Sequence, residues 1–135
     1  MVHPETVAEY VSAFGKAVEL CSGYYAEVAK LLHKAGKLVC VCDINEEVRS
    51  KFSKLGIKFV VCDIFDPCLD ILEYCRKADV VYSIRPPPEL WNSIAKLAEN
   101  CNCVCVIRPM KFDLCNVKGF KLEYYKDEIF YVSRV

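Results

Sequence analysis

The chain has 135 residues, of which 54% are hydrophobic and 27% charged, so it carries enough apolar material for one packed domain and too much for disorder. Its formal net charge is zero, which gives no global attraction to nucleic acid or to an anionic membrane. The apolar runs are strand-sized, whereas a membrane span needs roughly 18 apolar residues. We therefore expect a single cytoplasmic domain over residues 1–135.

The first predicted element is a helix within residues 1–15. Apolar side chains recur there at i, i+3, i+4 and i+7, namely Val7, Tyr10, Val11 and Phe14. A proline stands near the first turn and a glycine follows the last apolar residue, as is typical of helix ends.

Five apolar segments of strand length follow, and four helical segments separate them. The strands are predicted at residues 17–21, 38–42, 58–62, 79–83 and 103–107. Asn45 is a predicted N-cap of the second intervening helix. Most of these strands are apolar on both faces, which is typical of a buried parallel sheet between two layers of helices.

The C-terminal part, residues 119–135, reads as an antiparallel hairpin. Two alternating runs, 120–125 and 129–133, flank a short polar turn. The expected fold is therefore a Rossmann-like three-layer α/β/α sandwich with five parallel strands and a C-terminal hairpin. The apolar fraction and the hairpin tyrosines are consistent with a homodimer.

The ten cysteines are expected to serve mainly as small core side chains. No pair has C-x-x-C spacing, and both histidines lie far from any cysteine cluster. Cys40 and Cys42, like Cys101, Cys103 and Cys105, alternate so that each set shares one face of a strand. The alternatives are a disulfide, which suits a hyperthermophile's cytosol, and zinc. We predict no metal site.

In doubly wound sheets, ligands bind beyond the carboxyl ends of the strands. Asp43 ends the second strand, 20 residues after Gly23, where a carboxylate can accept hydrogen bonds from both ribose hydroxyls of a nucleoside. Asp63 ends the third strand and could accept from an adenine amino group. The alternative for each aspartate is a helix cap or a loop residue.

These residues follow the order of motifs in class I S-adenosylmethionine-dependent methyltransferases, which the chain resembles. The resemblance implies that Glu19 lies near the donor's amino group. It also implies that backbone amides of the loop Cys21-Ser22-Gly23 contact the donor's carboxylate. The family loop has three alternate glycines, but here Cys21 and Tyr25 replace the first and third. Their Cβ atoms restrict φ and crowd the ligand, so we expect weaker donor binding than an intact loop provides.

The whole chain more closely resembles an uncharacterised archaeal UPF family of short methyltransferase-like Rossmann proteins. The segment Tyr82–Leu90, with the sequence YSIRPPPEL, is the most specific match, and Ile107-Arg108-Pro109 supports it. This resemblance implies the strand order 3-2-1-4-5 followed by the hairpin. It also implies S-adenosylmethionine as the cofactor and an archaeal, thermophilic source.

The fourth strand lacks the Asp/Asn-Pro-Pro-aromatic stretch of amino-methylating enzymes, and Ser83 takes the place of its acid or amide. No general base is evident, so Ser83, Arg85 and Arg108 are the candidate catalytic residues. The two arginines follow neighbouring strands in matching Ile-Arg-Pro triplets. Two such guanidinium groups suit phosphate or carboxylate. Alternatively, they pair with acids such as Glu19, Asp63 or Glu89.

The leading hypothesis is an S-adenosylmethionine-binding, methyltransferase-like protein with an anionic acceptor, either RNA or a phosphorylated metabolite. Positioning the acceptor against the methyl group would supply the catalysis. The second hypothesis is a catalytically degenerate domain that senses a nucleotide or binds a protein. The third is an NAD-binding domain, because a strand, a glycine turn and a helix followed by Asp43 also suit that cofactor.

Overall fold

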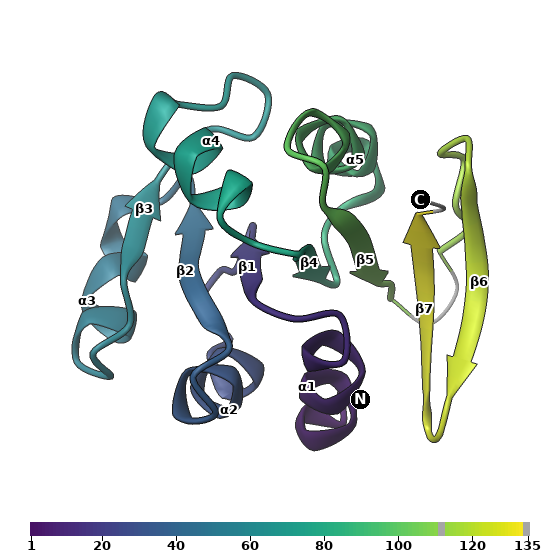
Figure 1. Ribbon diagram of the computed structural model, residues 1–135, viewed down its shortest axis with the longest axis horizontal. Helices are drawn as coiled ribbons and strands as arrows, with labels where there is room; N and C mark the ends of the chain where they lie inside the picture. Colours follow the sequence, from purple (N-terminus) through teal and green to yellow (C-terminus); the bar gives the residue numbers. More distant parts are fainter. Residues whose placement is uncertain (111–112, 134–135) are drawn as a thin grey trace.

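A computed structural model of the chain describes residues 1–110 and 113–133 and centres on one seven-stranded sheet (Figure 1). The strands are β1 (Ala17–Leu20), β2 (Leu38–Asp43), β3 (Phe59–Val61), β4 (Val80–Ile84), β5 (Val104–Arg108), β6 (Phe120–Tyr125) and β7 (Glu128–Ser133). Their spatial order is β3-β2-β1-β4-β5-β7-β6. Strands β1 to β5 are parallel, and β7 runs antiparallel to both β5 and β6. The predicted strand order and hairpin are confirmed, and residues 134–135 of the predicted hairpin lie outside the described residues.

Helices cover both faces of the sheet, which confirms the three-layer prediction. The helices are α1 (Pro4–Ser12), α2 (Glu27–Lys34), α3 (Arg49–Ser53), α4 (Leu69–Arg76) and α5 (Trp91–Asn100), with 3₁₀ turns η1 (Glu46–Val48) and η2 (Pro88–Leu90). In Figure 1, α4 and α5 lie above the sheet and α1 and α2 lie below it. No helix in the described parts of the chain is long and apolar enough to span a membrane.

The apolar pattern of the sequence explains these layers. Every residue of β1 and β4 is buried, as expected for central strands covered on both sides. The Asn45 side chain accepts a hydrogen bond from the Glu47 N–H at 3.0 Å, which confirms the predicted cap. The helix that follows is short, however, because its first turn is the 3₁₀ turn η1 and only residues 49–53 form α3.

The cysteines in or next to the strands β2, β3 and β5 pack on the α4/α5 side of the sheet. Cys40, Cys42, Cys62, Cys103 and Cys105 belong to one core cluster with Ile71 of α4 and Ile94 of α5. Seven of the ten cysteines are buried, and all ten are free thiols. These contacts are those of small apolar side chains. Within residues 1–110 and 113–133, no three His, Cys, Asp or Glu side chains are placed to hold a metal ion.

The N-terminal helix fastens the C-terminal hairpin to the sheet. The Tyr10 ring of α1 stacks on the Phe130 ring of β7 with 4.2 Å between centroids. The Lys126 ammonium lies 2.6 Å from the Glu9 carboxylate. Burial of Phe130 between α1 and the sheet therefore joins the two ends of the chain in one core.

The turn between α1 and β1 depends on Gly15. Its φ is +124°, and a Cβ atom there would overlap the Asp79 carboxylate. That carboxylate accepts a hydrogen bond from the Lys16 N–H at 2.9 Å and thereby ties the turn to the start of β4.

We expect Gly15→Ala to destabilise the fold more than Gly36→Ala. Gly36 also has a positive φ, of +71°, but a Cβ atom there meets nothing within 4 Å. The control should cost only about 1 kcal/mol of backbone strain, whereas Gly15→Ala adds the displacement of Asp79. Urea unfolding of both variants measures the difference. Equal free energies of unfolding would contradict this account of the turn.

Candidate ligand-binding site

The carboxyl ends of β1, β2 and β3 bring together the residues that the sequence singled out. We call Glu19, the loop Cys21-Ser22-Gly23, Asp43 and Asp63 the strand-end site. The carboxylates of Asp43, Glu19 and Asp63 all lie near enough to Cys21 to disfavour its thiolate. Together with burial, which is the largest cause, they raise the pKa of the Cys21 thiol to about 12. The site is therefore acidic, and its thiol is neutral at physiological pH.

Glu19 is fully buried because helices cover both faces of the sheet at the central strand β1. The parallel register places it opposite Tyr82 of β4, whose hydroxyl donates to Glu19 Oε1 at 2.7 Å. Among the described residues, Glu19 Oε2 has no hydrogen-bond partner although it is buried. Burial raises the pKa of Glu19, the Tyr82 hydrogen bond lowers it and the Asp43 carboxylate raises it, and the result is a pKa of about 8. Glu19 is therefore mostly protonated at pH 7.

The loop after β1 adopts the backbone of a glycine turn despite its sequence. Gly23 has a φ of +55°, and Cys21 also lies in the left-handed region with a φ of +57°. This conformation costs an ordinary L-residue about 1–2 kcal/mol. A Cβ atom at Gly23 would meet nothing within 4 Å, so space is open on that side of the loop. The turn thus persists although cysteine replaces the first glycine.

Hydrogen bonds join this loop to the end of β2. The Ser22 N–H donates to the Cys42 carbonyl at 3.2 Å, and the Gly23 N–H donates to Asp43 Oδ1 at 3.0 Å. Asp43 Oδ2 accepts from the Asn45 N–H, also at 3.0 Å. Asp43 therefore braces two loops at once. Each carboxylate oxygen can accept a further hydrogen bond, so capacity for a ligand hydroxyl remains.

Asp63 closes a tight turn at the end of β3. Its Oδ1 atom accepts from the Phe65 N–H at 2.9 Å. The Phe65 side chain is 63% exposed, and Ile44, directly after Asp43, is 64% exposed. Each acid is thus followed by an apolar side chain that the core does not use. The sequence reasoning missed both. An apolar residue directly after a strand-end acid was the available signal for Ile44, but the residue directly after Asp63 is Ile64, which is buried in the core.

Ser83 links β4 to β1 and leaves little of its hydroxyl for chemistry. It is fully buried, and its hydroxyl donates to the Leu20 carbonyl at 2.7 Å. The prolines that follow are fixed by Trp91, whose indole N–H donates to the Pro86 carbonyl at 3.0 Å. The end of β4 is therefore rigid.

The two arginines lie at one rim but have different surroundings. Both line a pocket of about 360 Å³ beyond the ends of β4 and β5. Arg85 is exposed, its guanidinium lies 5.3 Å from the Tyr25 ring centroid, and its backbone has a φ of +52°. Within residues 1–110 and 113–133, no acid forms an ion pair with it. Its side chain remains available to a ligand.

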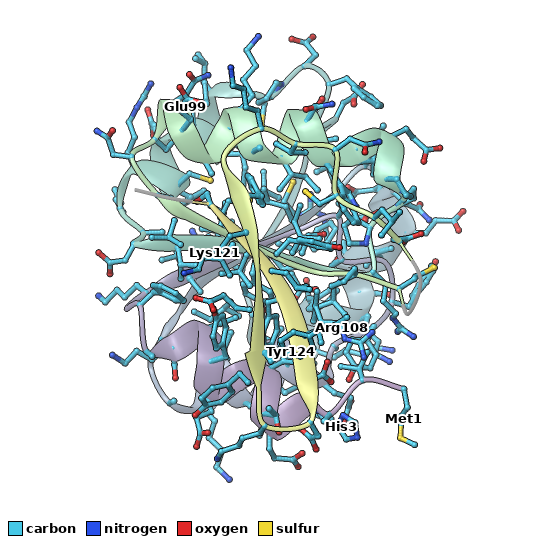
Figure 2. All side chains as sticks on the ribbon, turned by 90° about the vertical axis from the view of Figure 1, so that its right-hand side faces the viewer. Met1, His3, Glu99, Arg108, Lys121 and Tyr124 are labelled. Atoms are coloured by element: carbon cyan, nitrogen blue, oxygen red, sulfur yellow. The ribbon has the colours of Figure 1, made fainter. Side chains whose placement is uncertain are left out.

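Arg108 is held inside the protein by Glu128 of β7. Its Nε atom lies 2.7 Å from Glu128 Oε1, and a terminal nitrogen donates to the Met1 carbonyl at 2.9 Å. Glu128 is buried and also accepts from the His3 N–H at 2.7 Å. Figure 2 shows Arg108, His3 and Met1 at the same lower corner of the molecule. The acid that pairs with Arg108 is thus none of those the sequence suggested.

Sequence comparison gives the chain a family. A model described as an uncharacterised protein family, UPF0146, matches residues 1–135. A UPF0146 protein of Pyrococcus horikoshii is 42% identical over 112 residues, which cover 83% of this chain and 82% of that protein. One from Methanocaldococcus jannaschii is 32% identical over 133 residues and covers 94% and 93%, respectively.

Structural comparison agrees with the fold described above. An RNA methyltransferase from Salinibacter ruber, in complex with S-adenosyl-L-homocysteine, superposes with a TM-score of 0.64 at 16% sequence identity. The match covers 98% of this chain and 92% of that one. The chain therefore has a methyltransferase-like Rossmann fold over almost its whole length.

Burial of Glu19 predicts a pH-dependent stability. The folded state keeps the proton up to about pH 8, whereas the unfolded state loses it near the ordinary value of 4.5, so Glu19 stabilises the fold less as the pH rises between these values. Because glutamine cannot ionise, we expect Glu19→Gln to gain stability relative to the natural chain by about 1 kcal/mol per pH unit across this window.

Thermal unfolding from pH 5 to pH 8 measures this effect. The control is Glu99→Gln, which changes an exposed carboxylate on α5 and should leave the pH profile unchanged. Parallel profiles for Glu19→Gln and the natural chain would show that Glu19 is not protonated in the folded state.

Proposed function

The chain belongs to the uncharacterised protein family UPF0146, and we propose that it binds S-adenosylmethionine at the strand-end site as a methyltransferase-like protein. The observation that carries the proposal is Glu19 Oε2, a buried oxygen without a partner among the described residues. An unpartnered buried polar atom is costly. An ammonium group, such as the one on the methionine part of this cofactor, would supply both the missing donor and a compensating charge.

The neighbouring residues fit the rest of the cofactor. Asp43 can accept from the ribose hydroxyls while it keeps its two backbone hydrogen bonds. Asp63 can accept from the adenine amino group, and the exposed side chains of Ile44 and Phe65 offer apolar contacts to the base.

The cofactor's carboxylate would bind different backbone amides from those of Cys21-Ser22-Gly23, which the family resemblance implied. The N–H groups of Ser22 and Gly23 already have acceptors within the protein. The N–H groups of Tyr24 and Tyr25, just before α2, have none among residues 1–110 and 113–133. Unpaired amides ahead of a helix are suitable donors to an anion. We therefore assign the carboxylate to these two amides.

When bound, S-adenosylmethionine supplies an electrophilic methyl group, and the residues of this chain position the acceptor. Arg85 lines the pocket of about 360 Å³, forms no ion pair with the described acids, and would hold an anionic acceptor, either RNA or a phosphorylated metabolite. Arg108 instead maintains the shape of the rim through Glu128. Ser83 is committed to the Leu20 carbonyl and would not act as a base.

A second possible function is ligand sensing without catalysis, and the hydrogen bond that engages the Ser83 hydroxyl favours it. With its hydroxyl engaged, Ser83 cannot deprotonate an acceptor, and Arg85 can hold an anion but cannot take its proton. The proposals share one binding site and differ in whether a methyl group is transferred. NAD would use the same Asp43, so the binding experiment includes it.

We expect S-adenosylmethionine and S-adenosylhomocysteine to bind and to raise the melting temperature, with NAD clearly weaker. Asp43→Asn should weaken binding of both by about tenfold or more, because a hydrogen bond to a charged group contributes about 1.5–3 kcal/mol. Asp66→Asn, which changes an exposed aspartate nearby, is the control. Isothermal titration calorimetry measures all three ligands. No heat and no thermal shift at millimolar ligand would refute the proposal.

We expect Arg85→Ala to lower methyl transfer while leaving S-adenosylhomocysteine affinity unchanged. The assay follows labelled methyl groups from S-adenosylmethionine into total archaeal RNA and, separately, into the small-metabolite fraction. Arg85→Lys keeps the charge but loses the bidentate fork, so its methyl transfer should lie between that of the natural chain and that of Arg85→Ala. Transfer that is insensitive to Arg85→Ala would remove Arg85 from the acceptor site. Ligand binding without transfer to either pool would favour sensing.

A further inference from the structure

Strand β6 is an open edge of the sheet. It is the last strand in the order and pairs only with β7 among the described strands. Figure 2 looks straight at this edge: the hairpin stands in front of the molecule, with Lys121 and Tyr124 on it and no ribbon across it. The opposite edge strand, β3, is only three residues long. Short edge strands resist pairing, whereas an edge of six regular residues without proline is a template for another strand.

The hairpin geometry fixes which residues of β6 face outward. Tyr125 pairs with Glu128 across the two-residue turn, so this closing pair exchanges hydrogen bonds within the hairpin. Hydrogen-bonded and non-bonded pairs then alternate along the strand. Consequently the backbone N–H and C=O groups of Phe120, Leu122 and Tyr124 point toward the open edge.

The exposed side chains of β6 are self-complementary. If two β6 strands pair antiparallel about a two-fold axis through Leu122, Lys121 of each copy stands directly opposite Glu123 of the other. These two side chains are exposed, lie on one face of the strand, and form an ion pair within each copy with 3.6 Å between Lys121 Nζ and Glu123 Oε1. On the other face, Phe120 stands opposite Tyr124 of the second copy, and Leu122 meets its own equivalent. Opposite charges and aromatic pairs in directly opposed positions stabilise antiparallel strands.

The apolar exposure of the strand supports the same register. Leu122 is 41% exposed and Tyr124 is 77% exposed, on an edge where isolated monomers usually place protective groups. Phe120 lines a pocket of about 580 Å³ between α5 and residues 117–120. In this register, Tyr124 of the second copy would lie beside Phe120 at that pocket and lose its exposure.

We propose that β6 is a homodimer interface, in which two copies of the chain join their sheets antiparallel through β6 with Leu122 on the two-fold axis. The pairing is isologous, because each copy presents the same strand to the other. It adds about six backbone hydrogen bonds through the three outward-facing residues of each copy. The strand-end site and the arginine rim remain outside the interface, so this proposal does not depend on the ligand.

Charge variants test the register directly. The K121E chain carries two carboxylates on the strand and the E123K chain carries two ammonium groups, so each places like charges opposite one another in its own dimer. We expect each to raise the dimer dissociation constant by about tenfold. The double variant K121E/E123K restores opposite charges and should return to the natural value. Lys54→Glu makes the same change at an exposed lysine distant from β6 in the sequence, and it should leave the dimer dissociation constant unchanged.

Mixing the two single variants separates a pairing effect from a folding effect. In this register, a K121E chain attracts an E123K chain at both charge pairs, so the equimolar mixture should form heterodimers with about the natural affinity. Analytical ultracentrifugation of each protein and of the mixture measures these constants. A natural chain that remains monomeric at its highest soluble concentration would overturn the proposal. A mixture no tighter than its components would overturn it equally.

Discussion

A carboxyl group in the middle of a buried sheet loses its hydration, and Glu19 is held in that position by the parallel register of β1 and β4. Tyr82 satisfies one of its oxygens and burial keeps the other away from water, so the group stays protonated up to about pH 8. An ammonium group bound at the unpartnered oxygen would take the place of this proton, because a nearby cation favours the carboxylate. The same register therefore determines both the packing of the central strands and the chemistry at their carboxyl ends.

The sequence alone placed the sheet and most of the strand-end residues correctly. Apolar strands and polar residues at their ends are local patterns, so the strands themselves and the position of Asp43 could be predicted from them, whereas the order of the strands came from the family resemblance. The partner of Arg108 could not, because Glu128 lies next to a hairpin turn, where an acidic residue ordinarily faces water. It is buried where Arg108 and His3 bind its carboxylate, and the contact with His3 joins opposite ends of the chain. The positive φ of Cys21 could not be predicted either, because a cysteine rarely adopts the left-handed conformation.

The two Ile-Arg-Pro triplets have the same sequence but different surroundings, because different strands lie next to them. Arg108 ends β5, whose other neighbour is β7, and β7 brings Glu128 within 2.7 Å. Arg85 directly follows β4, whose other neighbour is β1, and its guanidinium lies over the Tyr25 ring without an ion pair to any described acid. One arginine therefore belongs to the framework, and the other remains available at the rim. A cation without an ion-pair partner among the described residues, beside the acidic strand-end site, is what an anionic substrate would require.

The central claim, that a neutral buried Glu19 receives the ammonium group of an adenosine-type cofactor, can be tested at the carboxyl group itself. The measurement is the pH titration of the Glu19 carboxyl carbon by NMR, with Glu19→Gln to assign the signal, in the absence and presence of S-adenosylhomocysteine. We expect a midpoint near pH 8 in the free protein and a lower one in the complex, because a bound cation favours the carboxylate. A midpoint near the ordinary value, or one that the ligand does not move, would contradict the account.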